Sequence, residues 1–428
     1  MTVDIRYPNL HDACREFLSD ALHLLRQHPP GVGTSPGETG TAEQLYRWLG
    51  EHRQELIALP SAARASAAVA QAGLNIGRVS DSEGKDLAAK TYAPWHVFEI
   101  VLAPLVAEYV GAKGGRSSYS ARLYSTIYAR LEERYSIGPL CRFVAPLENF
   151  DSERPRIRLE SDLWIERLTN ADSERLASFF HDFGPRSLAF LSGLRRPQWG
   201  IAMVAHDHPF APFSGHEGKF NAVTLALRLA APEPVGHRFV VHYPARRTSQ
   251  YGMTAGASWS MRPDLRYGPR YVLRRADQGR FRSTFRALSS GLALTAYPLA
   301  FSRFDDAYWR QSAADALVDI WIALESLFMP DGDPREATYR LALRIAYFLG
   351  RTSDDRVAID RNIRDSYRLR SDVVHGRSYS SSVLDAFTEK TANYLRRALR
   401  SVAQKGAQLD VDSIDRCVRA GKKPSDAE

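Results

Sequence analysis

The stretch YRLRSDVVHG, residues 367–376, carries two side chains that together could cleave a phosphodiester bond. Arg370 has a permanently charged guanidinium, which can bind a phosphate through two parallel hydrogen bonds. His375 follows five residues later, and histidine is the side chain most often used as a general acid or base. The same stretch is typical of a helix end, where an arginine in the last turn and a following glycine are ordinary. Spacing alone leaves both interpretations open.

The place of Arg370 on this helix separates it from a surface arginine. At about 100° per residue, with Ile363 taken as zero, Arg370 falls near −20°, at the centre of the apolar stripe. A buried unpaired guanidinium costs several kcal/mol, so we expect a partner for it, or a stripe that opens onto a cleft or a second subunit. His375 lies about 140° away on an ideal helix, a separation that unwinding of the last turn would reduce. Asp372 is a near neighbour that could orient the imidazole.

Four helical stretches after Phe304 must position these side chains. Apolar periodicity and end signals predict helices over 305–328, 334–350, 353–376 and 381–406. We expect Ser353 or Asp354 to cap the third helix and Gly376 to end it. The short connections predict an up-down four-helix bundle.

The part of the chain before this bundle divides in two. Residues 1–138 show helical periodicity, over 11–28, 41–59, 94–111 and 118–135. Residues 139–302 are predicted to form an α+β domain. Its short β-rich runs are RIRLESDLWIERL, WGIAMVAH, FNAVTLALRL, HRFVVHY and RYVLRR. One helix is expected to have Asn170 or Asp172 as its cap and Gly184 as its stop.

The predicted fold class is therefore α+β multidomain, in four segments. A helical N-terminal region (1–138) precedes the α+β middle domain (139–302) and the C-terminal four-helix up-down bundle (303–408). Residues 409–428 are expected to be a tail, disordered at GKKPSDAE.

Composition restricts the class of protein. Hydrophobic residues make up 44% and charged residues 25% of 428 residues, which is typical of a soluble globular chain. No apolar run reaches the ~18 residues that cross a bilayer, so we expect no membrane partner and a cytoplasmic location. Three distant cysteines predict neither a disulfide framework nor a cysteine metal site.

Positive charge is concentrated between Arg195 and Arg286. This segment has 15 Lys and Arg against 5 Asp and Glu, a net +10, whereas the whole chain carries +8. Basic doublets lie among aromatic residues, a pattern that suits phosphates and stacked bases. The candidate RNA-binding residues are Arg195, Arg196, Arg246, Arg247, Arg274 and Arg275, among Trp199, Tyr243, Tyr251, Trp259, Tyr267 and Tyr271. A solvated basic surface on a sheet is an equal alternative.

A histidine-rich loop is the one candidate metal site. His206, His208 and His216, with Asp207 and Glu217, include possible ligands. No fixed spacing relates them, and prolines and glycines separate them. We therefore expect no metal and no cofactor.

Three stretches together resemble the HEPN superfamily: YRLRSDVVHG, WIALESLF (321–328) and LALRIAYFLG (341–350). The likeness is greatest to the HEPN domains of ApeA-like anti-phage proteins. The family hallmark is an arginine, four to six residues and a histidine, near the end of the third helix of a four-helix bundle. Arg370 and His375 match it with four residues between them, and the resemblance covers about residues 304–405.

The resemblance implies a metal-independent endoribonuclease that acts as a homodimer through the bundle. Arg370 would bind the scissile phosphate, and His375 would be the general acid or base. The ribose 2′-OH would attack phosphorus, which leaves 2′,3′-cyclic phosphate and 5′-OH ends. The implied biology is a toxin-like effector of abortive infection, with tRNA or another cellular RNA as its target and a phage-derived trigger.

Three further residues are accessory in this resemblance. Ser371 stands where many active members carry a polar residue, often Asn. Asp372 and Glu325 are the other two, and pairing of Glu325 with Arg340 or Arg344 is its alternative role.

Two other functions remain open. The first is a non-catalytic HEPN module for RNA binding or dimerisation, in which Arg370 and His375 are structural. The second is a ligand-sensing protein that uses the middle domain, with the bundle as scaffold.

Overall fold

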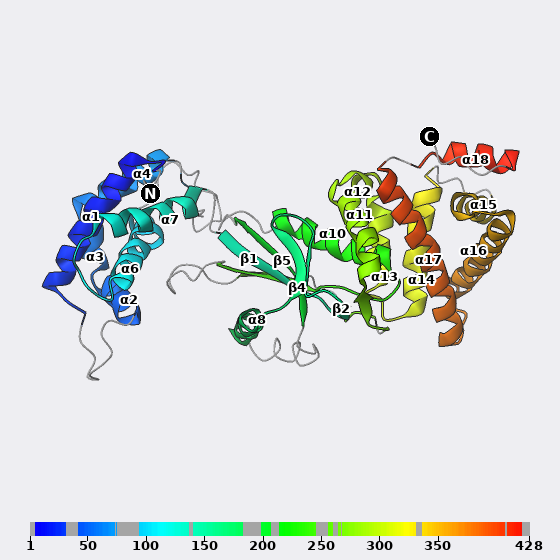
Figure 1. Ribbon diagram of the computed structural model, residues 1–428, viewed down its shortest axis with the longest axis horizontal. Coiled ribbons are helices and arrows are strands. Elements are labelled where there is room, and N and C mark those ends of the chain that lie inside the picture. Colours follow the sequence, from blue (N-terminus) through cyan, green and yellow to red (C-terminus); the bar gives the residue numbers. More distant parts are fainter. Residues whose placement is uncertain are drawn as a thin grey trace. The chain divides into compact units, whose positions relative to one another are not determined.

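The chain folds into two compact units (Figure 1). The computed structural model describes residues 5–30, 42–72, 74, 94–136, 140–182, 198–206, 214–244, 256–259, 264–266, 268–330, 336–406 and 409–421. The first unit comprises Met1–Phe143, Val204–Phe213 and Val241–Gly256, and the second comprises Val144–Met203, Ser214–Val240 and Ala257–Glu428. The boundary predicted near residue 302 does not separate units, because residues on both sides of it belong to the second.

Helices make up the first part of the chain, as its periodicity predicts. They are α1 (Pro8–Gln27), α2 (Ala42–Glu51), α3 (Arg53–Ile57), α4 (Pro60–Ala72), α5 (Pro94–Val97), η1 (Phe98–Leu102), α6 (Ala103–Ala112) and α7 (Ala121–Ser136). The helix expected over 41–59 is interrupted at His52. The alanine-rich α4 is not predicted, since alanine gives little contrast between buried and exposed faces.

A buried carboxylate joins the two ends of this helical region. Glu132 of α7 is 3% exposed. Its oxygens accept from the backbone amides of Arg6 (3.0 Å) and Tyr7 (2.8 Å), just before α1. Free amides at a helix start need such an acceptor, and the helix dipole favours a negative charge there. Tyr128, one turn earlier in α7, donates to the Tyr7 carbonyl at 3.2 Å.

The span Pro94–Ala112 is continuous through α5, η1 and α6. It is long and apolar enough to be a candidate membrane span, which the sequence was not expected to contain. Of its most apolar 18-residue window, 61% is buried inside the structure. Packing in the helical core therefore accounts for its composition.

The middle of the chain contains a six-stranded sheet in the order β3-β4-β5-β1-β6-β7 and a parallel pair, β2 with β8. The strands are β1 (Leu140–Pro146), β2 (Phe150–Ser152), β3 (Arg156–Arg158), β4 (Leu163–Arg167), β5 (Trp199–His206), β6 (Phe239–Pro244), β7 (Gly256–Trp259) and β8 (Tyr271–Leu273). RIRLESDLWIERL forms two strands, and β3 pairs antiparallel with β4, which pairs antiparallel with β5. The middle region is therefore α+β, as predicted.

One β-rich run was predicted wrongly. FNAVTLALRL lies inside α10 (Ser214–Ala230). Its apolar residues are buried on almost every side of the helix. Periodicity alone therefore cannot distinguish this short apolar run from a buried strand.

The helix α8 (Asn170–Asp182) begins with a different cap from the one expected. Thr169 Oγ1 accepts from the amide of Asp172 at 3.1 Å, and Asp172 accepts from the amide of Thr169 at 2.9 Å. Thr169 is thus the cap, and Asp172 is its reciprocal partner. The expected stop at Gly184 lies outside the described residues.

The helix predicted over 305–328 is two helices in the structure. The helices before it are η2 (Arg275–Asp277), α11 (Gln278–Ser289) and α12 (Leu292–Ala296). The predicted span is then divided between α13 (Pro298–Ala307) and α14 (Ala313–Phe328), and Ser312 is the cap of α14. Asp319 of α14, 3% exposed, accepts from Arg303 at 3.0 Å and from Arg310 at 2.6 Å. This carboxylate holds α13 against α14.

The remaining helices match their predicted spans closely. They are α15 (Ala337–Leu349), α16 (Ser353–Val374) and α17 (Ser381–Lys405). The cap of α16 is Thr352, which accepts from the amide of Asp355 at 3.1 Å, rather than Ser353 or Asp354.

Contacts between α16 and α17 show that these two helices are antiparallel. Ser366 Oγ and Thr391 Oγ1 lie 2.7 Å apart, and one turn earlier in α16 the Asn362 amide donates to the Tyr394 hydroxyl at 3.0 Å. Trp321 Nε1 of α14 also donates to Ser366 Oγ, at 3.1 Å. Three helices therefore meet at Ser366.

The helices α14 and α17 run in the same direction. Thr388 of α17 donates to the Ala313 carbonyl at the start of α14. At the other end Phe328 packs on Phe348 in the last turn of α15, whose final carbonyl accepts from Arg397. An up-down order would make the first and fourth helices antiparallel. The expected up-down order is therefore not followed.

The predicted tail is partly helical. Residues 411–420 form α18 (Val411–Ala420), which packs on α15. Arg344 of α15 donates to both carboxylate oxygens of Asp415, each at 2.8 Å. These hydrogen bonds hold the pKa of Asp415 below its usual value. Residues 422–428, most of GKKPSDAE, lie outside the described residues.

Candidate functional site

The end of α16 has a well-defined geometry. Gly376 has φ +81°, a left-handed conformation that glycine adopts without strain. Its amide donates to the Val373 carbonyl (3.0 Å), and the amide of Arg377 donates to the Asp372 carbonyl (2.9 Å). These two hydrogen bonds together form a Schellman motif. It fixes the backbone on both sides of His375, the C-cap residue.

Asp372 holds the segment that follows the helix. Its carboxylate accepts from Arg377 Nη1 at 2.8 Å and from the Tyr379 hydroxyl at 2.5 Å. The bond to Asp372 raises the pKa of Tyr379. The expectation that Asp372 orients the imidazole of His375 is therefore not met, because both oxygens serve other donors. Sequence reasoning missed Arg377 and Tyr379, although an acid five and seven residues before them was a signal.

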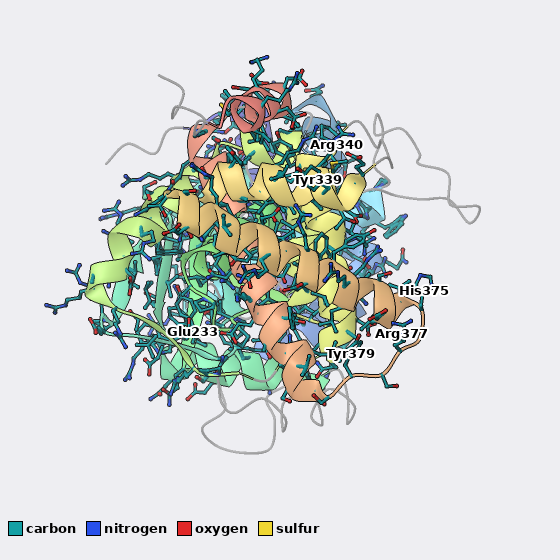
Figure 2. The ribbon with its side chains drawn as sticks, turned by 90° about the vertical axis from the view of Figure 1, so that its right-hand side faces the viewer. Glu233, Tyr339, Arg340, His375, Arg377 and Tyr379 are labelled. Atoms are coloured by element: carbon teal, nitrogen blue, oxygen red, sulfur yellow. The ribbon has the colours of Figure 1, made fainter. Side chains whose placement is uncertain are left out.

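His375 is exposed at this helix end. Figure 2 shows it beside Arg377 and Tyr379, where α16 passes into the loop that leads to α17. Within the described part of the chain its imidazole has no hydrogen-bond or ion-pair partner. Both ring nitrogens are therefore available to a substrate or to a second chain.

Arg370 lies on the packed side of α16, as expected, but it is only half-buried. The buried line of α16 runs through Ile359, Ile363, Ser366 and Leu369, and Arg370 is half-buried beside it. Its Nε atom is buried and has no hydrogen-bond partner among the described residues. Such a donor carries a desolvation penalty unless another molecule supplies an acceptor.

Arg370 and His375 do not meet within one chain. The helix stays regular to Val374, so the unwinding that would bring them together does not occur. They point about 140° apart around the axis. No hydrogen bond joins them among the described residues. The geometry therefore offers a guanidinium and an imidazole on neighbouring but different faces.

Glu325 lies away from Arg370. Helices α14 and α16 are antiparallel and meet where Trp321 contacts Ser366. Glu325 is one turn beyond Trp321 and Arg370 one turn beyond Ser366, in opposite directions, about 12 Å apart along the axis. The structure does not bring these two residues together.

The alternative role for Glu325 is also not observed. Among the described residues Glu325 forms no ion pair, and Arg344 donates to Asp415 and to the Phe328 carbonyl instead. Ser371 is half-buried, next to Arg370 in sequence.

The candidate RNA-binding residues are described only in part. Arg195, Arg196, Arg246 and Arg247 lie outside the described residues, as do Tyr251 and Tyr267. Arg274 and Arg275 are exposed, after β8. Their side chains have no hydrogen-bond or ion-pair partner within the described ranges.

Much of the basic charge of this segment is neutralised by structural ion pairs. Six of its cations pair with acids, and for five of them at least one of these acids lies outside the segment. The pairs are Lys219 with Glu160 and Asp162, Arg228 with Asp305, Arg238 with Glu148 and Asp264, Arg266 with Asp385, Arg270 with Asp151, and Arg280 with Asp277. The net +10 of the segment is thus not a +10 surface.

The described aromatic rings of the segment cannot stack on bases. Trp199 is 1% exposed, Tyr271 1% and Tyr243 6%. They pack in the core; Phe150, for example, contacts both Trp199 and Tyr271. The interleaving of arginine and aromatic residues therefore reflects strands with one buried face.

No metal cluster is found among the described residues. His206 approaches Glu133 at 3.9 Å, and His216 lies at the start of α10. His208 and Asp207 fall outside the described ranges.

The available groups suit phosphate chemistry. A guanidinium with an unused donor can bind an anionic oxygen, and an exposed imidazole can move a proton near neutral pH. Neither group requires a metal. No family model, curated protein or solved structure matches this chain.

Proposed function

We propose that the chain is a metal-independent endoribonuclease of HEPN type and a toxin-like effector of anti-phage defence, acting on cellular RNA in the cytoplasm. The observation that carries the proposal is the half-buried Arg370, whose Nε lacks an acceptor, five residues before an exposed His375. The resemblance of residues 304–405 to HEPN domains supports the assignment. The proposal rests on these side chains and not on the order of the helices.

The chemistry follows from the two side chains. Arg370 binds a non-bridging oxygen of the scissile phosphate and stabilises the charge that develops there. His375 takes the proton from the ribose 2′-OH, or gives one to the leaving 5′-oxygen. The nucleophile belongs to the substrate, so no metal-bound water is needed. The products end in 2′,3′-cyclic phosphate and 5′-OH.

A homodimer accounts for the angle between the two groups. Within one chain they lie on different faces of α16. A second copy packed against this helix end would place His375 of one chain beside Arg370 of the other. Val374 (54% exposed), Tyr379 (38%) and Val383 (39%) supply apolar surface around the site for such contact.

The test uses induced expression and sequencing of RNA 5′-OH ends. We expect Arg370→Ala and His375→Ala each to lower cleavage at least 100-fold and to restore growth. The matched control is Arg368→Ala, since Arg368 is an exposed arginine of the same helix that pairs with Asp365. Equal cleavage by the wild-type protein and all three variants would exclude the proposed nuclease activity.

A non-catalytic HEPN module is the second candidate. The separation of Arg370 and His375 within one chain favours it, because general acid-base catalysis requires both groups at one phosphate. In that case the purified protein binds RNA without forming cyclic phosphate ends, and the two alanine variants change affinity but not cleavage.

A further inference from the structure

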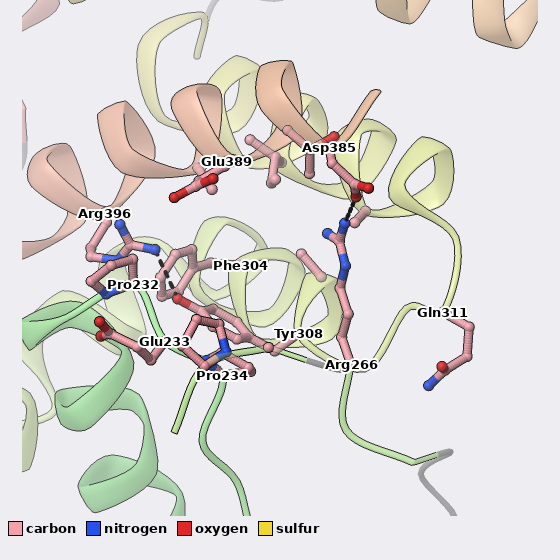
Figure 3. Close-up of a pocket in the computed structure, with 17 residues that line it drawn as sticks. Pro232, Glu233, Pro234, Arg266, Phe304, Tyr308, Gln311, Asp385, Glu389 and Arg396 are labelled. Carbon is pink, nitrogen blue, oxygen red and sulfur yellow. Dashed lines mark hydrogen bonds and ion pairs between the residues drawn. The ribbon is translucent and has the colours of Figure 1, made fainter. Parts of the chain in front are cut away.

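A cavity of about 580 Å³ lies within the second unit. Its walls come from the turn after α10, the loop around Arg266, and helices α13, α14 and α17. Figure 3 shows Phe304 and Tyr308 in its centre, between Glu389 of α17 and Glu233 of the turn. The volume suits a ligand of small-molecule size.

The two arginines of the cavity already have partners. Arg266 pairs with Asp385 across one end of it. Arg396 is 5% exposed and donates to the Arg228 carbonyl at 2.9 Å and to the Tyr308 hydroxyl at 3.0 Å. Their donors therefore serve the fold, and little of either guanidinium remains for an anionic ligand.

Two carboxylates of the cavity have no partner within the described part of the chain. Glu233 and Glu389 form no hydrogen bond or ion pair among the described residues. The lining contains three acidic side chains and two arginines, so its net charge is −1. The unpaired charges are both negative, and they face the cavity from opposite walls.

The apolar part of the cavity is rigid. The ring of Tyr308 lies under the guanidinium of Arg228, 4.5 Å from its centroid, and its hydroxyl accepts from Arg396. Phe304 is fully buried and packs edge-on against Tyr308, at 5.4 Å between centroids. Because Arg228, Arg396 and Phe304 hold the Tyr308 ring in place, little side-chain entropy would be lost when a ligand binds.

We propose that this cavity binds an organic amine cation with an aliphatic body. Glu233 and Glu389 would each accept from an ammonium group, and the methylene chain would lie on Tyr308, whose ring is backed by the buried Phe304. A diamine or polyamine satisfies both carboxylates at once. An anion would meet two uncompensated negative charges. This proposal does not depend on the proposed ribonuclease activity, because neither Arg370 nor His375 lines the cavity.

The test is calorimetric titration of the full chain, freed of nucleic acid, with spermidine at about 150 mM salt to screen non-specific binding. We expect saturable binding of one spermidine per chain. Glu233→Gln and Glu389→Gln should each weaken it at least 5-fold, and the double variant should abolish it. Glu174→Gln, an exposed acid of α8 without a partner in the described chain, is the charge-matched control and should bind normally.

A second variant tests the site by volume instead of charge. Ala392→Phe places a ring into the cavity from α17 and should abolish binding at unchanged helix content. The proposal is overturned if spermidine does not saturate, if Glu174→Gln weakens binding as much as the cavity variants, or if citrate binds in its place.

Discussion

At the scale of the residue, Arg370 differs from Arg344 and Arg396, two buried arginines that organise the second unit. Arg344 donates to a carboxylate and to a carbonyl, and Arg396 donates to a carbonyl and a hydroxyl. Arg370 has neither, and its Nε is buried without an acceptor. A group that lowers the free energy of unfolding is expected where function requires it.

Because Arg370 lacks an acceptor and Arg344 has several, replacing each by leucine should have different effects on the free energy of unfolding. Arg370→Leu should leave the free energy of unfolding unchanged or raise it by up to ~1 kcal/mol, because it removes an unsatisfied donor and keeps apolar contact. Arg344→Leu should lower it by about 2 kcal/mol or more, because Asp415 loses its partner. Urea denaturation measures both. A loss for Arg370→Leu as large as for Arg344→Leu would show that Arg370 is a structural residue.

At the scale of the element, a short chain of polar groups sets how α14, α16 and α17 align. Trp321 donates to Ser366, Ser366 and Thr391 are hydrogen-bonded, and Thr391 donates to the Phe387 carbonyl at 2.7 Å. Ser366 is fully buried, so each of these partners depends on it. The position of Arg370, one turn further along α16, depends on the same contact.

Ser366→Ala should therefore be costly for so small a change. The indole N–H of Trp321 would lose its acceptor in a buried place, which lowers the free energy of unfolding by about 1–3 kcal/mol. Ser378→Ala is the control, since Ser378 is exposed and should change stability by less than about 0.5 kcal/mol. Equal midpoints of unfolding for the two variants would contradict the role given to Ser366.

At the scale of the whole molecule, the positive charge is less available than composition suggests. Ion pairs with acids occupy Lys219 and Arg270, whereas Arg274 and Arg275 are exposed without partners in the described chain. Only unpaired cations release counterions from a phosphate backbone when RNA binds.

The salt dependence of the proposed RNA binding should reflect this difference between paired and unpaired cations. For a single-stranded RNA, Arg274→Ala with Arg275→Ala should reduce the slope of log K against log salt by about 1.4, or 0.7 for each lost contact. The double variant Lys219→Ala/Arg270→Ala should leave this slope unchanged, although it also removes two positive charges. Fluorescence anisotropy at several salt concentrations measures both slopes. Similar reductions for the two pairs would mean that the ion pairs open on binding.

Local patterns were enough to predict the helical character of the N-terminal region, although not α4, the α+β character of the middle and the spans of α16 and α17. They were enough because periodicity and glycine stops act within a few residues. The same local reasoning failed at FNAVTLALRL, where full burial removes the periodicity, and at residues 308–312, where Asp319 and its two arginines stabilise a break between helices.

Chemistry within a few residues places Arg370 and His375 at the end of a helix that stops at Gly376, and this could be predicted from the sequence. The neighbours of these two residues follow from the folded structure. It assigns Asp372 to Arg377 and Tyr379, moves Glu325 away from Arg370, buries three aromatic rings and pairs six basic residues. The contacts of Asp372 are local, with partners five and seven residues away. The other outcomes depend on contacts between residues far apart in the chain, and no spacing along the sequence encodes those distances.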